Sequence, residues 1–152
     1  MPSHAFYRTP LGYLKIGYEG DFVVSAKLVE APDSPHIPSS LSELAAAQFL
    51  EYLGGIRRSF DFPMFFSGTA FQLRVWNALL EIPYAQTRTY GEIAAAIGSP
   101  VAARAVGMAC SRNPIWIAVP CHRVVGKGQL LTGYAGGLDL KQRLLELEQT
   151  HI

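Results

Sequence analysis

Three capping boxes limit the possible folds of this chain most strongly. A Ser or Thr followed three residues later by Glu or Gln satisfies the free N–H groups of a helix's first turn. The boxes pair Ser40 with Glu43, Thr69 with Gln72, and Thr89 with Glu92. Stop signals follow each of them, at Gly54-Gly55, Pro83 and Gly98. The sequence therefore predicts three helices that begin at these boxes.

The residues before the first box have the pattern of strands. Residues 13–18 and 22–28 are rich in β-branched and aromatic side chains, and the turn residues 19–21 separate them. This pattern predicts an antiparallel hairpin. Residues 31–38 contain three prolines and form a stiff loop before the first helix.

Residues 61–68 form a second loop and mark a boundary. We expect an α+β fold, with a small N-terminal α+β lobe over residues 1–66 and a second lobe over residues 67–152. Hydrophobic residues make up 49% of the 152 residues and charged residues 16%, so the chain can bury a real core and is not disordered.

The second lobe contains a helix-turn-helix candidate. After Gly98, Ser99 is a predicted N-cap with Pro100 at the first helical position, and the helix runs to about Arg112. Ala103 and Gly107 are small enough to let this helix approach a partner closely, and Arg104 and Arg112 are its only charges. The pattern fits a DNA-binding motif, but a helical hairpin packed on the core is the commoner structure with this pattern.

The positive charge of the chain is concentrated in one window. The formal net charge is +1, but residues 82–133 carry five basic residues against Glu92 alone, a local charge of +4. Such a window suits a polyanionic partner, although a solvated surface has the same composition. No apolar run reaches the ~20 residues of a membrane span, and the first residues lack a signal peptide's pattern. We expect a cytoplasmic protein, or a nuclear one if its source is eukaryotic, with no membrane partner.

The two cysteines are either buried small hydrophobes or reactive thiols. Cys110 lies among small residues of a helix, which favours packing. Cys121 follows a predicted buried strand over residues 115–119, and His122 and Arg123 come directly after it. Neighbouring basic groups favour the nucleophilic thiolate, although adjacent residues of an extended segment point in opposite directions. The four histidines are scattered and no CxxC spacing occurs, so no metal site is predicted.

Residues 117–124, Ile-Ala-Val-Pro-Cys-His-Arg-Val, resemble the active-site signature of the O6-alkylguanine-DNA alkyltransferases. The resemblance is close over residues 67–148 and loose over residues 1–66, where it rests mainly on residues 9–12. Other motifs agree with the family in order and spacing: Phe71-Gln72, Val75-Trp76, Ile82-Pro83, residues 89–94, residues 104–107, Asn113-Pro114, residues 133–137, and Leu144-Leu145 with Glu148.

The resemblance implies a monomeric DNA-repair protein that transfers an alkyl group from O6 of guanine to its own cysteine, once per molecule and without a cofactor. Its partner would be double-stranded DNA containing O6-alkylguanine, bound through the minor groove with the damaged nucleotide flipped out. A stacked base cannot be attacked in line, which independently requires extrusion. The implied fold is a ribonuclease-H-like first lobe and a winged-helix-like second lobe.

The resemblance also assigns catalytic roles to five residues. Cys121 would accept the alkyl group, and His122 would take the thiol proton through a water molecule. Glu148 would orient His122, Asn113 would brace the active-site turn, and Tyr90 would donate a proton or hydrogen bond to the departing guanine. Glu148 could instead be a solvated acid on a helix surface.

Further residues would contact DNA or the flipped base. Arg104 would fill the vacated base stack, helped by DNA contacts from Thr89, Ala103, Gly107 and Arg112. Tyr134 would line the alkyl pocket unless it merely packs, and the Val124 carbonyl would bind the guanine amino group. Pro120 and Trp76 would complete the pocket.

Two features depart from the family's pattern. A glycine often stands two residues after the Ile-Pro, where this chain has Ala85. No cysteine precedes Cys110, so the first-lobe zinc site of the human-type protein is absent, whereas Cys121 separates the chain from the subgroup that lacks the acceptor.

Two other function classes compete with alkyl transfer. One is a winged-helix DNA-binding regulator in which Cys121 is structural or a sensor. The other is a thiol hydrolase, but its Cys and His normally come from separate segments, and no oxyanion motif is visible. Only an alkyltransferase becomes permanently modified by an alkylated guanine substrate.

Overall fold

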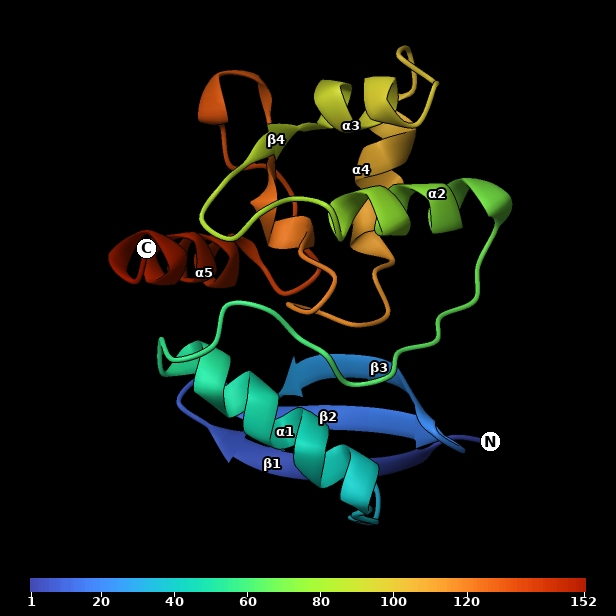
Figure 1. Cartoon of the computed structure of the whole chain (residues 1–152), viewed down its shortest axis with the longest axis vertical. Helices are drawn as coiled ribbons and strands as arrows, with labels where there is room; N and C mark the ends of the chain where they lie inside the picture. Colours follow the sequence, from blue (N-terminus) through green and yellow to red (C-terminus); the bar gives the residue numbers. More distant parts are fainter. The chain divides into compact units, whose positions relative to one another are not determined.

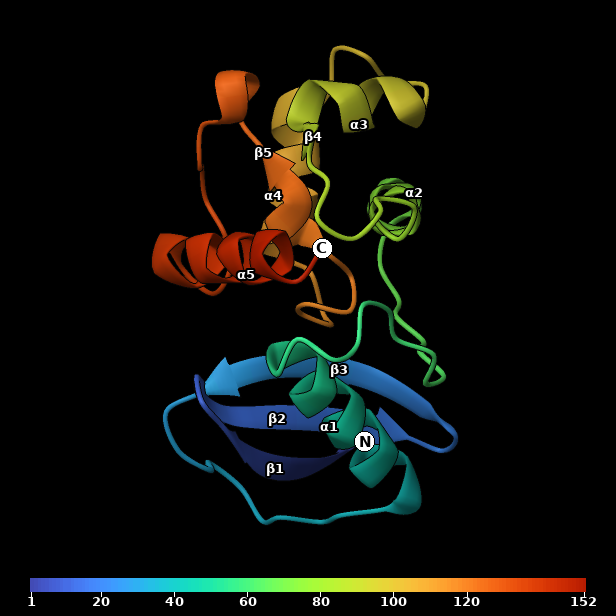
Figure 2. The same cartoon turned by 60° about the vertical axis from the view of Figure 1, so that its left-hand side comes forward.

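The computed structural model describes all 152 residues, which form two compact units, Met1–Phe66 and Ser67–Ile152. Figures 1 and 2 show strands and helices in both units, so the fold is mixed α and β. Each unit has its own buried apolar residues. No helix has both the length and the apolar character needed to cross a membrane.

The N-terminal unit begins with a three-stranded antiparallel sheet in the order β1-β2-β3. Its strands are β1 (Ser3–Thr9), β2 (Gly12–Glu19) and β3 (Phe22–Val29). The predicted hairpin is confirmed as β2 and β3. The sequence analysis missed β1, which pairs with β2 along its whole length.

Helix α1 (Ser40–Leu53) lies across one face of this sheet (Figure 1). The predicted cap is one residue late, because the N-cap is Ser39 and the reciprocal partner is Ser42 instead of Glu43. The Ser42 hydroxyl accepts from the Ser39 N–H at 2.8 Å. It therefore takes the acceptor role in the capping box that was expected of the Glu43 carboxylate. Gly54 caps the other end, as predicted.

The C-terminal unit contains four helices. They are α2 (Ala70–Leu79), α3 (Tyr90–Ala96), α4 (Ala103–Ser111) and α5 (Leu138–Thr150). The capping boxes of Thr69 with Gln72 and of Thr89 with Glu92 are confirmed. Helices α2, α3 and α4 pack against one another.

Helix α4 begins later than the sequence predicts. Ser99 and Pro100, predicted as the N-cap and the first helical residue, lie before the helix. The Ser99 N–H donates to the Ala94 carbonyl at 2.9 Å and completes the end of α3. Ala102 is the N-cap and makes no side-chain capping bond. The two helices are therefore joined by a turn over residues 97–102, in which Gly98 has a positive φ of 79°.

The predicted strand over residues 115–119 is wrong, although the segment is buried as expected. It folds into a tight loop in which the Val119 N–H donates to the Ile115 carbonyl at 3.0 Å. Ile117 has a φ of 73°, which is rare for a β-branched residue and ends any extended pairing. Apolar content identified the burial, but the segment forms an isolated bridge between its own Trp116 and Val119 instead of joining a sheet.

The chain then forms a short helical turn, η1 (Cys121–Arg123), and the two-residue strand β5 (Val124–Val125). Strand β5 pairs in parallel with β4 (Arg88–Thr89). A second turn, η2 (Lys127–Gln129), follows, and α5 contacts η1. These elements bring the Cys121 segment, α3 and α5 together.

Candidate active site

Cys121 is the first residue of η1 and is 2% exposed. Successive residues of a 3₁₀ turn are about a third of a turn apart. Cys121 and His122 therefore do not project from opposite faces of a strand, as an extended segment would require. The tight loop and the helical turn replace the strand end expected from the sequence.

Asn113 fastens the loop that carries the thiol. Its amide nitrogen donates to the Val119 carbonyl at 2.8 Å and to Cys121 Sγ at 3.1 Å. Its Oδ1 accepts from the Ile115 N–H at 3.0 Å. One buried side chain thus holds the beginning and the end of the loop, which is the geometry that a bracing role requires.

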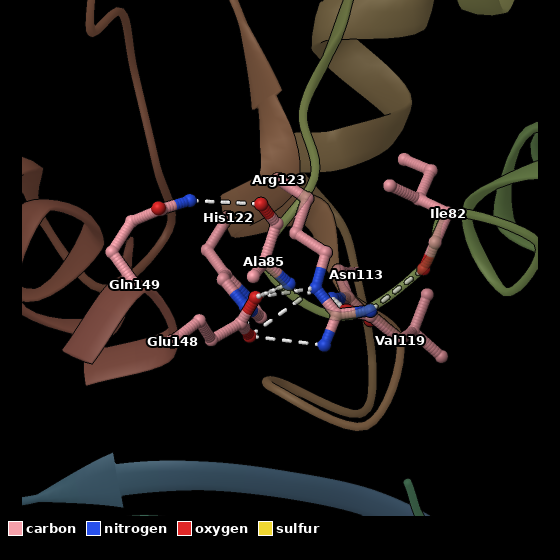
Figure 3. A network of polar contacts seen from close by, with 8 residues as sticks. All are labelled: Ile82, Ala85, Asn113, Val119, His122, Arg123, Glu148 and Gln149. Atoms are coloured by element: carbon pink, nitrogen blue, oxygen red, sulfur yellow. Dashed lines mark hydrogen bonds and ion pairs between the residues drawn. The ribbon is translucent and has the colours of Figure 1, made fainter. Parts of the chain in front are cut away.

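His122 and Glu148 form a buried pair, shown in Figure 3. His122 Nε2 lies 2.7 Å from Glu148 Oε2, and the two side chains are 0% and 1% exposed. Glu148 comes from α5, 26 residues further along the chain. It is therefore not a solvated helix acid.

Arg123 binds the same carboxylate. Its Nε donates to Oε1 at 2.9 Å, its Nη2 donates to Oε2 at 2.9 Å, and its Nη1 donates to the Ile82 carbonyl at 2.7 Å. The N–H of Ala85 donates to Oε1 as well, at 2.9 Å (Figure 3). Arg123 is thus buried and neutralised, so it adds nothing to the surface charge predicted for residues 82–133.

These contacts determine the ionisation of Glu148 and His122. Burial alone would raise the pKa of Glu148, but hydrogen bonds from His122 and Arg123 and their charges outweigh it and hold the pKa at about 2. Burial lowers the pKa of His122, and the hydrogen bond to Glu148 opposes this only in part. With Glu148 ionised, Nε2 carries the proton of a neutral imidazole and Nδ1 is the basic nitrogen.

The two thiols differ in acidity. Burial raises the pKa of Cys121 to about 11, although the hydrogen bond from Asn113 and the positive charge of Lys141 oppose this. Burial raises the pKa of Cys110 further, and no hydrogen bond opposes it. Cys121 is therefore the more acidic thiol, yet it is protonated at neutral pH until a base removes the proton.

A cavity of about 780 Å³ lies between α3, α4 and the loop before α5. It is lined by Tyr90, Ala103, Arg104, Gly107, Met108, Ser111 and residues 132–135. Tyr90 and Tyr134 line it and are both within electrostatic reach of the Cys121 thiol. The Tyr134 hydroxyl is buried without a hydrogen-bond partner.

The remaining predicted residues are divided between the cavity and its supports. Ala103, Arg104 and Gly107 line the cavity, whereas Thr89 caps α3 and Arg112 is exposed at the end of α4. Pro120 and Val124, also predicted as pocket residues, flank η1, are buried and are not among the residues that line the cavity.

Trp76, predicted as a pocket residue, is not among the residues that line this cavity. Its indole N–H donates to the Ala109 carbonyl at 2.9 Å, and the ring is buried between α2 and α4. A large apolar ring with one donor suits this packing position, where it joins the two helices.

The sequence analysis missed Lys141 and the role of Arg123. Lys141 lies on the buried face of α5 with Leu144 and Glu148, at positions that recur with helical spacing. A lysine within an apolar stripe was the available signal. Nowhere in the structure do three or more His, Cys, Asp or Glu side chains gather as a metal site would require.

Comparisons with known proteins identify the family of this chain. The family model "6-O-methylguanine DNA methyltransferase, DNA binding domain" matches residues 70–150. A methylated-DNA–protein-cysteine methyltransferase of Methanosarcina acetivorans is 47% identical over 151 residues, covering 95% of this chain and 97% of the relative. One from Mycobacterium bovis is 45% identical over 152 residues, covering 95% and 92%.

Solved structures of the same family have a similar fold. The crystal structure of Mycobacterium tuberculosis OGT in complex with DNA has a TM-score of 0.89 and 43% identity, and the match covers 97% of this chain and 93% of that one. The M. tuberculosis O6-methylguanine methyltransferase structure has the same TM-score and identity, over 100% and 95% of the chains. The chain therefore belongs to the O6-methylguanine-DNA methyltransferase family.

Proposed function

We propose that this protein repairs DNA by direct reversal, moving an alkyl group from O6 of guanine irreversibly to Cys121. The observation that carries the proposal is the buried set of Asn113, Cys121, His122 and Glu148 beside a cavity within a methyltransferase family chain. DNA containing O6-alkylguanine is the substrate, and each molecule acts once.

The reaction forms a bond between Cys121 Sγ and the alkyl carbon as the bond from that carbon to O6 breaks. The bonding electrons pass to the purine, and the thiol proton passes to His122 Nδ1 through a water molecule. Glu148 then stabilises the imidazolium, because its ionised carboxylate lies 2.7 Å from Nε2. The product is a thioether, which has no good leaving group, so the thiol is not regenerated.

Proton removal must be coupled to the attack. With a pKa of about 11, almost no Cys121 thiolate exists at neutral pH. A neutral imidazole can accept the proton at that pH, whereas an imidazolium cannot. The low pKa of Glu148 keeps a negative charge beside His122 throughout.

Tyr90 and Tyr134 act on the flipped base from the cavity wall. Tyr90 donates a hydrogen bond or its proton to the purine as negative charge develops there. Tyr134 lines the alkyl pocket, and the Val124 carbonyl binds the guanine amino group. The exclusion of water by these side chains strengthens each polar contact.

DNA binding falls to the C-terminal unit, in which α3 and α4 act as the helix-turn-helix of a winged-helix-like module. Ala103 and Gly107 allow α4 to approach the minor groove closely, and the exposed Arg104 fills the vacated stack. Thr89 and Arg112 contact the backbone. The M. tuberculosis relative crystallised with DNA supports this assignment. The N-terminal unit is the ribonuclease-H-like part.

The test is incubation with duplex DNA that contains one O6-methylguanine, followed by intact mass and peptide mapping. We expect the mass of one methyl group on the Cys121 peptide and none on the Cys110 peptide, with no more than one transfer per protein. Cys110→Ser should still react, and Cys121→Ser should not. An adduct on Cys110, or repeated turnover, would contradict the proposal.

A further inference from the structure

Lys141 is a buried cation without an acidic partner. It is 0% exposed on the inner face of α5, yet it forms no ion pair with any carboxylate of the chain. Burial lowers its pKa accordingly. Because burying an uncompensated charge is unfavourable, packing alone does not explain a lysine at this position.

The ammonium group is directed at Tyr90. Lys141 Nζ donates to the Tyr90 hydroxyl oxygen at 3.4 Å and to the Thr132 carbonyl at 2.9 Å. It also lies 5.6 Å from the centre of the Tyr90 ring, within the range of a cation–π contact. Lys141 is therefore held by two residues that line the cavity.

Two hydrogen-bond donors surround the Tyr90 hydroxyl oxygen, so its own O–H must point away from both of them. Thr132 Oγ1 donates to it at 3.1 Å, and Lys141 donates at 3.4 Å. A phenol oxygen has one proton and two acceptor positions, so both acceptor positions are taken. The Tyr90 O–H then donates toward the Gly133 carbonyl, at the long distance of 3.5 Å, which a better acceptor in the cavity can replace.

We propose that Lys141 is a positioning residue for alkyl transfer: it makes Tyr90 a hydrogen-bond donor toward the substrate and stabilises the negative charge that Tyr90 acquires when guanine departs. This inference rests on the proposed function and adds a residue to it. Lys141 acts through Tyr90 and does not contact the alkyl group.

The proton movements balance. The proton of Cys121 goes to His122, and the proton of Tyr90 goes to the purine nitrogen as the O6–carbon bond breaks. Tyr90 is then a phenolate beside the Lys141 ammonium, and solvent returns the proton of His122 to it. Burial raises the pKa of Tyr90, so a phenolate there depends on a neighbouring cation.

Lys141 also affects the attacking thiol. The titratable groups around it come from α3, α4 and η1, and they are Tyr90, Cys110, Cys121 and His122. Its charge lowers the pKa of both thiols and of His122. For proton transfer from Cys121 to His122 these two effects oppose each other, because the thiol becomes more acidic and the imidazole becomes a weaker base. The contribution of Lys141 to alkyl transfer is therefore mainly the one it makes through Tyr90.

The test is a double-mutant cycle on the full chain with free O6-benzylguanine, which removes DNA binding from the measurement. Lys141→Met should lower the single-turnover rate by about 10- to 100-fold, the effect of one hydrogen bond from a charged donor. In a Tyr90→Phe background the same change should cost less than about threefold, because coupled residues are not additive. Lys27→Met, an exposed lysine of the N-terminal unit, is the matched control and should have no effect.

A second probe separates this role from a structural one. With 8-bromo-O6-benzylguanine the departing purine is the stronger acid, so Lys141→Met should cost less than with O6-benzylguanine. If Lys141→Met does not fold, Lys141→Gln enters the same cycle, since it keeps a donor and loses the charge. Equal losses with and without the Tyr90 hydroxyl, or no loss, would overturn the inference. Absence of any adduct on wild-type Cys121 would instead overturn the proposed function.

Discussion

The two units of this protein bury very different polar groups. The N-terminal unit buries two uncharged polar residues, Ser42 and Gln48. Ser42 belongs to the capping box of α1, and Gln48 binds Asp61. The C-terminal unit buries five polar or charged residues: Asn113, His122, Arg123, Lys141 and Glu148. A buried charge is unfavourable unless it is paired, and perturbed charges cluster at functional sites. The distribution of buried charge therefore indicates that the C-terminal unit carries the chemistry.

Backbone strain follows the same division. The non-glycine residues with positive φ are Ala85, Ile117 and Gln129, all in the C-terminal unit. Ala85 donates its N–H to Glu148, and Ile117 lies in the loop that Asn113 fastens. Such conformations cost about 1–3 kcal/mol each and persist where surrounding contacts enforce them. The N-terminal unit uses glycine at each of its positive-φ positions.

The largest effect on stability should come from Glu148→Gln. The change leaves Arg123 buried beside a neutral amide, and breaking a buried pair costs about 3–5 kcal/mol. Urea unfolding followed by circular dichroism measures this loss. A cost below about 1 kcal/mol would mean that the C-terminal unit does not depend on its buried charges.

Glu148 should also make the free energy of unfolding fall as the pH is lowered below about 4.5. The pKa of Glu148 is about 2 in the folded chain and 4.5 when unperturbed, so the unfolded state binds the proton first as pH falls. The stabilisation, about 3 kcal/mol, is complete above pH 4.5 and is lost between pH 4.5 and 2. In Glu148→Gln, the free energy of unfolding measured against pH should lack this acid-induced decrease.

Arg104→Ala should separate DNA handling from chemistry within the C-terminal unit. Without a side chain to fill the stack, transfer from duplex O6-methylguanine should slow by about 10- to 100-fold, since extruding a base costs a few kcal/mol. Transfer from free O6-benzylguanine should slow much less, because a free base needs no extrusion. Arg143→Ala, another exposed arginine, is the control. Equal losses on both substrates would assign Arg104 to folding or chemistry.

Gln48→Leu tests the N-terminal side of the comparison. The Gln48 amide bonds both the side chain and the N–H of Asp61, and the side chain is buried. Its loss should cost about 1–2 kcal/mol of stability, because buried partners lose their hydrogen bonds. Alkyl transfer at a temperature where the variant is folded should match the wild type. A slower transfer would show that the N-terminal unit contributes to the chemistry.

Ala85→Gly should have the smallest effect. Ala85 has a φ of 65°, a conformation that glycine adopts without steric cost. Relief of that strain exceeds the entropy lost, so stability should rise by about 0.5 kcal/mol. Thermal unfolding measures the difference. A loss of stability would mean that the alanine methyl group makes contacts worth more than the strain.

Most helix starts could be predicted from local signals, although Ser99 does not cap α4 and the α1 cap is one residue earlier than predicted. The Thr69 and Thr89 caps were predictable because both partners lie within one turn of helix. The strand over residues 115–119 was wrong because β-branched content predicts burial, whereas a strand also needs a neighbour to pair with. Strand β1 was missed because its pairing with β2 supplies most of its signal.

The candidate site followed a similar rule. Cys121, His122, Asn113 and Glu148 could be proposed from the sequence because they lie in motifs that resemble a known family. The buried position of Lys141 and the ion pair of Arg123 depend on α5 packing against η1 and on contacts between distant segments. The sequence alone does not show whether a charged side chain will be buried.

The pH dependence of single-turnover alkyl transfer from O6-methylguanine duplex DNA tests the proton relay most directly. Wild type and Glu148→Gln should be compared from about pH 6 to pH 9, under conditions where near-ultraviolet circular dichroism shows both folded. The variant should be slower, since its imidazolium lacks an adjacent carboxylate, and should regain part of the rate at high pH, where more Cys121 thiolate forms unaided. A variant with the wild-type rate and the wild-type pH profile would show that Glu148 takes no part in the proton relay, which would then consist of Cys121 and His122 alone.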